Sequence, residues 1–291
     1  MKWLDLTLIG VFILLFSFTP VSQTLFQEVK GIETTIVTDI SLATDKGILP
    51  PSLSAKAVTI YDLDHQNFLY QKSANEKFYP ASTTKIVTAL VSLLTYQTDQ
   101  VLTVKNGYQA IGSTIKLHQD EEITFNNLLS GLLIASGNDA ALTLAENHPD
   151  GYAGFVNAMN RYVEKLGLVD THFTNPSGII NPNHYTTAAD LNFLAKEAFS
   201  NASIRKVIAI KTATIEDINH KYEHQLESTN KLLDLEGVRG MKTGWTPESG
   251  ECLVTVVERN GHSLLIVLLN STDRFGESKS LIDWAYQNFS W

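Results

Sequence analysis

Three short polar motifs, far apart in the chain, constrain its fold more than any other feature. They are Ser-Thr-Thr-Lys at residues 82–85, Ser-Gly-Asn at residues 136–138 and Lys-Thr-Gly at residues 242–244. Their serine and lysine side chains can act together only if folding gathers the three segments around one hydroxyl group. We therefore expect a fold that brings these segments into a single cleft.

The order and surroundings of the motifs carry this prediction, because the first two patterns recur by chance. S-x-x-K occurs four times in the chain and S-x-N three times, whereas Lys-Thr-Gly occurs once. Only the match at Ser82 closely follows a proline and opens an apolar run, residues 86–94, that is typical of a buried helix. Ser82 and Lys85 are three residues apart, so they should share one face of its first turn.

This pairing predicts a serine nucleophile with a lysine base. A serine hydroxyl is a weak nucleophile that needs a base within hydrogen-bond reach. A free lysine, with a pKa of about 10.4, is protonated at neutral pH. Burial, a helix N-terminus and a second cation each lower the pKa of a lysine. We therefore expect Lys85 to be the neutral base and Lys242 to be its charged partner.

The composition fits a globular protein that does not bind nucleic acid. The net charge of −9 argues against a polyanionic partner. The single cysteine, Cys252, excludes an internal disulfide and falls in an apolar strand pattern, which indicates a small core residue.

The N-terminus has the pattern of a targeting segment. Residues 6–18 carry no charge and follow Lys2, but a membrane-spanning helix needs about 20 residues. We expect residues 1–26 to be a signal peptide or an N-terminal membrane anchor, with Lys2 on the inner side. Residues 27–53 are expected to be a polar connector.

Residues 54–291 are expected to form one α+β domain. Strand patterns occur at residues 57–61, 68–72, 237–245, 252–259 and 262–270, the last two joined by the turn signal Asn-Gly. Helical periodicity occurs at residues 86–94, 124–136, 140–146, 155–166, 187–199 and 277–288, with Asp139 as the expected cap of the third segment. This order predicts an antiparallel sheet flanked by helices, with a largely helical subdomain inserted between its N- and C-terminal strands.

The motifs resemble those of the low-molecular-mass penicillin-binding proteins of the D-alanyl-D-alanine carboxypeptidase family. The resemblance runs over residues 54–291 and is carried by residues 79–85, 133–141, 171–178, 184–191 and 240–246. It implies a β-lactamase/DD-peptidase-like fold and no cofactor. It also implies a serine-type D-Ala-D-Ala carboxypeptidase that removes the terminal D-alanine from peptidoglycan pentapeptide.

The resemblance further implies partners and a location. The substrate would be the peptidoglycan stem peptide, and β-lactam antibiotics would be covalent inhibitors. The enzyme would work outside the cytoplasm, on the outer face of the cytoplasmic membrane, or in the periplasm or the medium if the signal is cleaved.

A catalytic role for each motif residue follows from the same resemblance. Ser82 would form the acyl-enzyme, and Lys85 would take its proton. Ser136 and Asn138 would pass the proton to the leaving D-alanine and hold the substrate amide. Lys242 would orient Ser136.

Substrate binding is expected of Thr243, Gly244, Trp245 and Arg274. Thr243 would bind the terminal carboxylate of the substrate, with Arg274 assisting it. The backbone N–H groups of Ser82 and Trp245 would form the oxyanion hole.

Two departures from the family pattern stand out. The all-β C-terminal domain and the C-terminal amphipathic anchor of many relatives have no counterpart before Trp291, so we expect any membrane attachment to use the N-terminal segment. Residues 179–183, Ile-Ile-Asn-Pro-Asn, form a loop that the family analogy does not define.

A β-lactamase or a DD-endopeptidase on the same fold would use the same groups. Class A β-lactamases employ a glutamate to hydrolyse the acyl-enzyme. The candidate here, Glu164, lies in a helical pattern and is expected to face solvent. Substrate assays alone distinguish an endopeptidase from a carboxypeptidase.

A zinc peptidase is a further alternative, because residues 220–224 match H-x-x-E-H. The flanks lack the long helix that such a motif requires, and no third ligand is evident. We therefore expect no metal, and an exposed pair of histidines on a strand or turn. His184 is expected to support loop structure and not to transfer protons.

Overall fold

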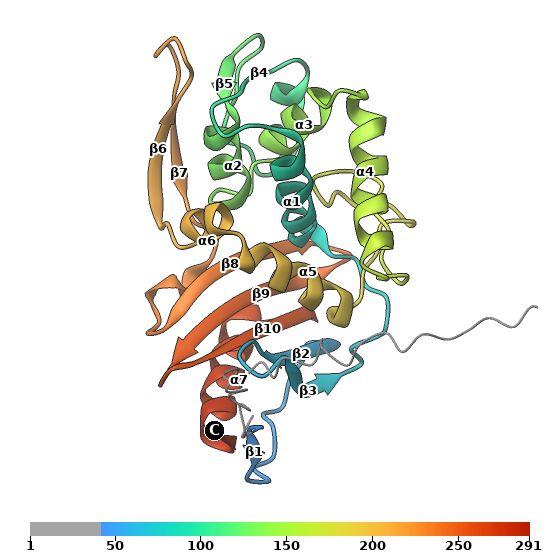
Figure 1. Cartoon of the computed structure of the whole chain (residues 1–291), viewed down its shortest axis with the longest axis vertical. Coiled ribbons are helices and arrows are strands. Elements are labelled where there is room, and N and C mark those ends of the chain that lie inside the picture. Colours follow the sequence, from blue (N-terminus) through green and yellow to red (C-terminus); the bar gives the residue numbers. More distant parts are fainter. Residues whose placement is uncertain (1–41) are drawn as a thin grey trace, which may run out of the picture. The chain divides into compact units, whose positions relative to one another are not determined.

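A five-stranded antiparallel sheet joins the two ends of the described chain, residues 42–291 of the computed structural model (Figure 1). Its strands follow the order β3-β2-β10-β9-β8. They are β2 (Ala57–Asp62), β3 (Asn67–Lys72), β8 (Val238–Thr246), β9 (Gly250–Arg259) and β10 (His262–Ser271). Because β2 pairs with β10, N- and C-terminal segments share one sheet, as predicted.

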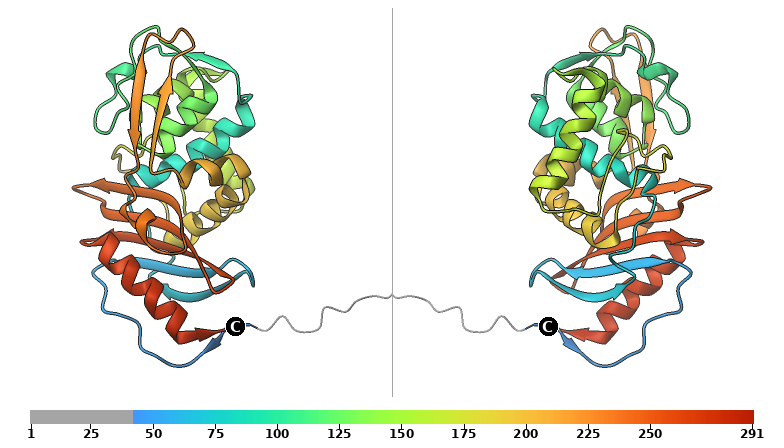
Figure 2. Two further views of the ribbon diagram at one scale, coloured as in Figure 1. Left: turned by 90° about the vertical axis from the view of Figure 1, so that its left-hand side faces the viewer. Right: turned by 90° about the vertical axis from the view of Figure 1, so that its right-hand side faces the viewer.

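Side chains of β10 alternate between two cores, one on each face of the sheet. Leu265 and Val267 pack in the core that the inserted helices cover. Leu264 and Ile266 pack in the second core, against helix α7 (Arg274–Asn288). Figure 2 shows α7 on one face of the sheet and the longer helices of the inserted region on the opposite face. Burial of both faces explains why β9 and β10 have nearly continuous apolar sequences.

The hairpin between β9 and β10 turns where the Asn-Gly signal predicts it. Asn260 and Gly261 have φ angles of 53° and 81°. A two-residue turn of this kind requires positive φ at both central positions, which asparagine and glycine tolerate best.

The inserted region is largely helical, as expected. Its helices are η1 (Ala81–Thr84), α1 (Lys85–Thr95), η2 (Gly107–Gln109), α2 (Phe125–Leu133), α3 (Asn138–Glu146), α4 (Gly151–Lys165), α5 (Ala188–Ser200), α6 (Ala202–Ile208) and η3 (Lys231–Asp234). Helix α1 is the centre of this region: its residues 85–92 are all buried, and it contacts α2, α4 and α5. The first residue of this central helix is the motif lysine, Lys85.

Several short elements were not predicted. They are helix α6, the strand pairs β1 (Thr44–Asp45) with β11 (Phe289–Ser290) and β4 (Val101–Thr103) with β5 (Glu122–Thr124), and the hairpin of β6 (Thr212–Glu216) and β7 (Glu223–Glu227). Their apolar residues are too few to give a clear period.

The expected cap of helix α3 is wrong in detail. Gly137 occupies the N-cap position, and Asp139 lies in the first turn. The Asp139 carboxylate instead accepts hydrogen bonds from the backbone N–H groups of Ile115 and Leu117, which lie in another loop.

The N-terminal end of the described chain packs against helix α7. Strand β1 pairs with β11, and Trp284 Nε1 donates to the Ile48 carbonyl at 2.8 Å. The last part of the expected connector, from β1 to Ile48, therefore packs on this domain. The predicted signal or anchor, residues 1–26, lies outside the described residues. Within residues 42–291, no helix combines the length and the apolar character that crossing a membrane requires.

Candidate active site

Ser82 lies in the short helix η1, where two glycines allow unusually close backbone contacts. Gly178 has a φ of +85°, and a Cβ atom there would lie 1.9 Å from the Ala81 carbonyl oxygen. A Cβ atom on Gly244 of β8 would lie 3.0 Å from the Ser82 backbone nitrogen. The Ser82 turn is therefore held closely between strand β8 and the loop that contains Gly178.

The side-chain nitrogen of Lys85 lies among three oxygens at the base of this turn. Lys85 Nζ is 2.9 Å from Ser82 Oγ, 2.6 Å from Asn138 Oδ1 and 2.8 Å from the Ser177 carbonyl oxygen. The Lys85 side chain is completely buried. Burial, and then the nearby charge of Lys242, hold the pKa of Lys85 well below its ordinary value, against the opposing effect of Asp139.

Lys242 forms the second cationic position of the site. Its Nζ donates to Ser136 Oγ at 2.9 Å and to the Thr243 carbonyl at 3.0 Å. Burial, with the charge of Arg274 as a second cause, lowers the pKa of Lys242 to about 7. The ammonium form of Lys242, the charged partner of our hypothesis, is then present at neutral pH together with the neutral amine.

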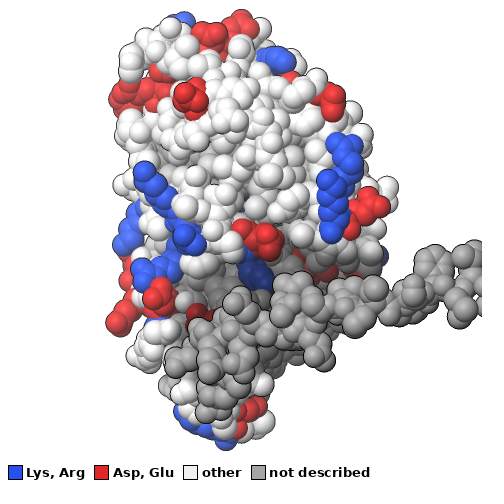
Figure 3. Space-filling model, in the orientation of Figure 1, with Lys and Arg blue, Asp and Glu red and all other residues white. Residues whose placement is uncertain are grey.

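Both lysines of the site are buried, so the positive charge of the Lys242 ammonium form does not lie at the surface. Lys85 and Lys242 are 0% and 1% exposed. On the face shown in Figure 3, surface Lys and Arg side chains are interspersed with Asp and Glu ones around a largely uncharged centre. A small anionic group that entered the site would therefore meet a local positive field within an acidic protein.

Asn138 is oriented by a loop that the motifs do not contain. Its Nδ2 donates to the Ile111 carbonyl at 2.6 Å, and its backbone N–H donates to the Ser113 carbonyl at 2.7 Å. These two bonds direct the amide oxygen toward Lys85.

Arg274 and Thr243 lie on the β8 side of the site. Arg274, the first residue of α7, donates from Nη1 to the Gly244 carbonyl at 2.7 Å. Thr243 Oγ1 is 2.6 Å from Thr229 Oγ1. Arg274 is half-buried and linked to the Lys-Thr-Gly strand, so it is not an isolated surface cation.

A cleft of about 380 Å³ opens over Ser82. Its lining includes Ser82, Ile111, Gly112, Ser113, Asn138, Ser177, Gly178, Ile179, Trp245 and Thr246. Trp245 is 59% exposed at this cleft. A larger hollow of about 830 Å³ lies elsewhere, near Lys56 and Lys72, but it contains none of the motif residues. We assign the site to the smaller cleft because a nucleophile, a base and hydrogen-bond donors meet there.

Sequence reasoning assigned no role to several residues of this cleft. Ser177 belongs to a segment that supported the resemblance, but its carbonyl contact with Lys85 depends on a loop conformation. Ser113 begins one of the chance S-x-x-K matches, yet it lies beside Asn138. Thr229 gave no signal, because its contact with Thr243 arises from the path of the chain after β7.

His184 supports a loop, in agreement with its predicted role. Its Nε2 is 2.8 Å from Thr84 Oγ1, and its Nδ1 accepts a hydrogen bond from the Thr174 N–H at 3.1 Å. Burial, and then His172, lower the pKa of His184 to about 3. It is therefore neutral at physiological pH.

Three other sequence expectations can be compared with the structure. Cys252 is buried, as predicted, and burial raises the pKa of its thiol to about 11. Glu164 is exposed on α4, also as predicted. The H-x-x-E-H motif lies on the β6–β7 hairpin: His220 is exposed, but His224 is buried, so the expectation of two exposed histidines is wrong for His224.

Comparison with known proteins identifies relatives of the chain. The sequence profile of a family described as D-alanyl-D-alanine carboxypeptidase matches residues 44–273. D-alanyl-D-alanine carboxypeptidase DacF of Bacillus subtilis is 34% identical over 248 residues, which cover 81% of this chain and 63% of that protein. DacA of Haemophilus influenzae is 28% identical, over 84% of this chain and 64% of that protein. The chain thus spans slightly less than two thirds of the length of these relatives.

A solved structure and one shorter relative extend the comparison. The D-alanyl-D-alanine carboxypeptidase of Streptomyces sp. K15 is 32% identical, over 70% of this chain and 76% of that protein. The crystal structure of the Streptomyces K15 DD-transpeptidase superposes with a TM-score of 0.78 at 29% identity, over 82% of this chain and 100% of that chain.

Proposed function

Because the chain belongs to the D-alanyl-D-alanine carboxypeptidase family, we propose that it is a serine-type D-Ala-D-Ala carboxypeptidase. In this proposal Ser82 attacks the last peptide bond of a peptidoglycan pentapeptide, forms an acyl-enzyme and releases the terminal D-alanine. The observation that carries the proposal is the 2.9 Å separation between Lys85 Nζ and Ser82 Oγ beside the cleft.

The contacts of Lys85 support its role as the base. A neutral amine has two N–H groups and one lone pair, and the low pKa of Lys85 favours this form. The amide oxygen of Asn138 and the carbonyl oxygen of Ser177 can only accept hydrogen bonds, so they occupy the two N–H groups. The lone pair is then left for the hydroxyl proton of Ser82, as general-base catalysis requires.

Ser136 is suited to return the proton to the leaving group. Its hydroxyl lies 2.9 Å from Lys242 Nζ, and a lysine with a pKa of about 7 can both give and regain a proton at neutral pH. In the proposed sequence the D-alanine nitrogen gains a proton through Ser136. Water then attacks the ester: its proton passes through Ser136 back to Lys242, and Ser82 Oγ regains its proton from Lys85.

The β8 side of the cleft is suited to bind the substrate. Gly244 lets this strand approach the Ser82 backbone nitrogen, so the N–H groups of Ser82 and Trp245 are our candidates for the oxyanion hole. One such donor contributes about 3 kcal/mol to the transition state in other enzymes. Thr243, with Arg274 nearby, is the candidate site for the terminal carboxylate of the substrate.

A β-lactamase is less well supported than a carboxypeptidase. Rapid deacylation in class A enzymes needs a glutamate that activates water. Within the described residues, no carboxylate lines the cleft, and Glu164 is exposed on α4. We therefore propose that β-lactams are covalent inhibitors that leave slowly. A DD-endopeptidase remains the alternative, because it uses the same groups on a cross-linked substrate.

We further propose that the domain works outside the cytoplasm, where peptidoglycan is found. Residues 6–18 carry no charge and follow Lys2, which supports export. Residues 1–26 would either anchor the protein on the outer face of the membrane or be removed as a signal peptide. The proposed chemistry uses side chains and water, so it calls for no cofactor or metal.

Mass spectrometry after incubation with penicillin tests the nucleophile. We expect one adduct, on the tryptic peptide that contains Ser82, and no adduct in the Ser82→Ala variant. Ser113→Ala is the matched control, because Ser113 also lines the cleft and also begins an S-x-x-K match. An adduct on Ser113, or one that survives in Ser82→Ala, would overturn the assignment.

Chromatography of a pentapeptide ending in D-Ala-D-Ala tests the reaction. A carboxypeptidase releases one D-alanine and leaves a tetrapeptide, and Ser82→Ala abolishes the release. Cleavage of cross-linked muropeptides without release of D-alanine would identify an endopeptidase instead. Rapid loss of penicillin without a lasting adduct would identify a β-lactamase.

A further inference from the structure

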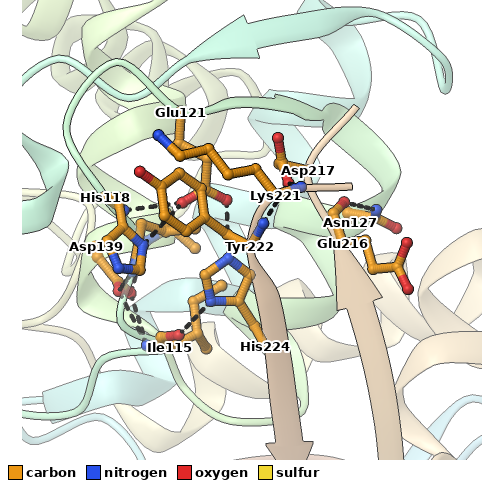
Figure 4. Close-up of polar contacts among 12 residues, drawn as sticks. Ile115, His118, Glu121, Asn127, Asp139, Glu216, Asp217, Lys221, Tyr222 and His224 are labelled. Carbon is orange, nitrogen blue, oxygen red and sulfur yellow. Dashed lines mark hydrogen bonds and ion pairs between the residues drawn. The ribbon is translucent and has the colours of Figure 1, made fainter. Parts of the chain in front are cut away.

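A buried polar network connects the β6–β7 hairpin to the loop that orients Asn138 (Figure 4). We define this His224 network as Ile115, Glu121, Asp139 and His224. The His224 side chain is 2% exposed and that of Glu121 is completely buried. Charged groups at this depth are costly unless they are paired, so their arrangement calls for a reason.

The two ring nitrogens of His224 both face hydrogen-bond acceptors. Nδ1 lies 2.9 Å from the Ile115 carbonyl oxygen, and Nε2 lies 2.8 Å from Glu121 Oε1. A carbonyl oxygen cannot donate, so Nδ1 must carry a proton. The second contact then requires one more proton, shared between the imidazole and the carboxylate. An imidazolium paired with a carboxylate satisfies both contacts. When this proton leaves, the bond to Glu121 is lost, although Nδ1 can still donate to the Ile115 carbonyl.

The segment that His224 binds is also bound by the start of helix α3. The backbone N–H groups of Ile115 and Leu117 donate to Asp139 Oδ2 at 2.9 and 3.1 Å. Asp139 is the neighbour of Asn138, whose side chain and backbone donate to the carbonyls of Ile111 and Ser113. Residues 111–117 are thus fixed by the hairpin on one side and orient Asn138 on the other.

We propose that His224 and Glu121 are positioning residues for the reaction at Ser82. Their ion pair fastens residues 111–121 to strand β7, and this loop holds the Asn138 amide oxygen against Lys85. Neither residue lines the cleft, so the proposed effect passes through the loop. The kinetic part of this inference rests on the proposed function, because acylation of Ser82 is its readout.

The charges around His224 define how the network responds to pH. From the loop, Glu121 and His118 face the ring, and from α3 the charge of Asp139 reaches it. On the hairpin, Tyr222 stacks on His118, and the turn carries Asp217 and Lys221. Burial lowers the pKa of His224, but its bonds to Glu121 and Ile115 and the negative charges of Glu121 and Asp139 raise it above 6.5 overall.

The sign of the pH effect follows from this raised pKa. The ion pair is fully formed below the pKa of an unfolded histidine, about 6.5. It is lost as the pH rises through the higher folded-state value. The contribution of the ion pair to the positioning of Asn138 should therefore be greatest in mildly acidic solution and should decrease in alkaline solution.

Penicillin acylation rates of paired variants test the proposal. His224→Gln keeps a polar side chain but cannot donate to Glu121 and Ile115 together. Misplacement of catalytic groups by about 1 Å can cost a hundredfold in rate, so we expect His224→Gln to slow acylation about ten- to hundredfold. His220→Gln is the matched control on the same hairpin, because the His220 side chain is exposed and pairs with Glu216, outside the His224 network. It should acylate at the wild-type rate.

The pH profile separates positioning from simple destabilisation. The ratio of wild-type to His224→Gln rates cancels the titration of Lys85, which both proteins share. This ratio should be largest below about pH 6.5 and should fall at higher pH. Glu121→Gln removes the carboxylate that raises the pKa of His224. The ratio of the Glu121→Gln rate to the His224→Gln rate should therefore begin to fall at a lower pH than the wild-type ratio. A ratio that does not change with pH would overturn the proposal.

Hydrogen exchange provides a readout that needs no enzymatic activity. In His224→Gln, measured well below its unfolding temperature, the amides of Ile115, Leu117 and Asn138 should exchange at least tenfold faster, while those of α1 keep their protection. His220→Gln should leave all of them unchanged. If loop exchange in His224→Gln equals that of the wild type, the positioning role is refuted, even though penicillin labels Ser82 of the wild type. Faster exchange in a protein that penicillin does not label would instead refute only the proposed function.

Discussion

Lys242 Nζ lies 2.9 Å from Ser136 Oγ, although the two residues are 106 positions apart in the chain. Lys242 comes from strand β8, and Ser136 comes from the turn before helix α3, where its φ is +60°. This buried contact joins the second and third motifs, in the same way that Lys85 joins the first and second. It also places a lysine with a pKa of about 7 next to the hydroxyl that is proposed to protonate the leaving group.

The Michaelis constant for a D-Ala-D-Ala peptide should rise as the pH passes through about 7, because Lys242 then loses the charge that attracts the substrate carboxylate. The lowered pKa gives this sign: the ammonium form exists below about 7 and not above it. Steady-state kinetics between pH 5.5 and 9, in steps of about half a unit, measure the effect.

Lys242→Arg is the matched control for this pH dependence. A guanidinium keeps its charge over the whole range, so the alkaline rise in the Michaelis constant should disappear even if the maximal rate is lower. If Lys242→Arg shows the same alkaline rise as the wild type, the titrating group is a different one.

Gly178→Ala should destabilise the protein and prevent acylation of Ser82. Alanine at a positive φ costs about 1–2 kcal/mol from the backbone alone. The new Cβ would in addition lie 1.9 Å from the Ala81 carbonyl, directly before the nucleophile. Thermal unfolding and penicillin labelling measure the two effects.

Gly167→Ala is the control that distinguishes the contact of a Cβ at Gly178 with the Ala81 carbonyl from the cost of a positive φ. Gly167 has a φ of +74°, but no atom lies within 4 Å of its ideal Cβ position. It should lose about 1 kcal/mol and remain fully able to acylate. Equal effects of the two substitutions would show that the contact with Ala81 does not matter.

The sheet could be predicted from the sequence because its strands are long and their turn is specific. Strands β9 and β10 are ten residues each with largely apolar centres, and Asn260-Gly261 defines the turn between them. The β6–β7 hairpin could not be predicted in the same way. It is covered on one face only, and its buried positions include a histidine, His224, which a hydrophobic pattern does not register.

The motif residues were likewise easier to predict than their partners. Serine and lysine at fixed spacing are visible in sequence, whereas the Ser177 and Ile111 carbonyls that hold Lys85 and Asn138 are backbone atoms. Every residue has such a carbonyl, so only the path of the chain selects the ones that act. The contact between the Thr229 and Thr243 hydroxyls also depends on the path of the chain, although it is made by side chains.

Arg274→Ala should raise the Michaelis constant of a peptide with a free C-terminal carboxylate about ten- to hundredfold, the value of a hydrogen bond to a charged group. The guanidinium also lowers the pKa of Lys242, so its removal should move the alkaline rise to a higher pH. A peptide with an amidated C-terminus should be affected much less.

Arg239→Ala is the control for the loss of one positive charge. Arg239 lies on the same strand as Lys242 but pairs at the surface with Glu258. It should change neither the Michaelis constant nor its pH dependence. A shift of similar size in both variants would mean that net charge, and not the position of Arg274, affects binding.

Acylation by penicillin should change the intrinsic fluorescence through Trp245. This side chain is 59% exposed at the cleft, so a bound acyl group displaces water from the indole. Trp284 and Trp291 instead donate to the Ile48 carbonyl and the Asp62 carboxylate near the C-terminus, away from the cleft lining. Stopped-flow fluorescence should show a change at the acylation rate in the wild type and none in Trp245→Phe, although mass spectrometry still finds the adduct. A full signal in Trp245→Phe would mean that acylation alters the protein far from the cleft, which the rigid packing around Ser82 argues against.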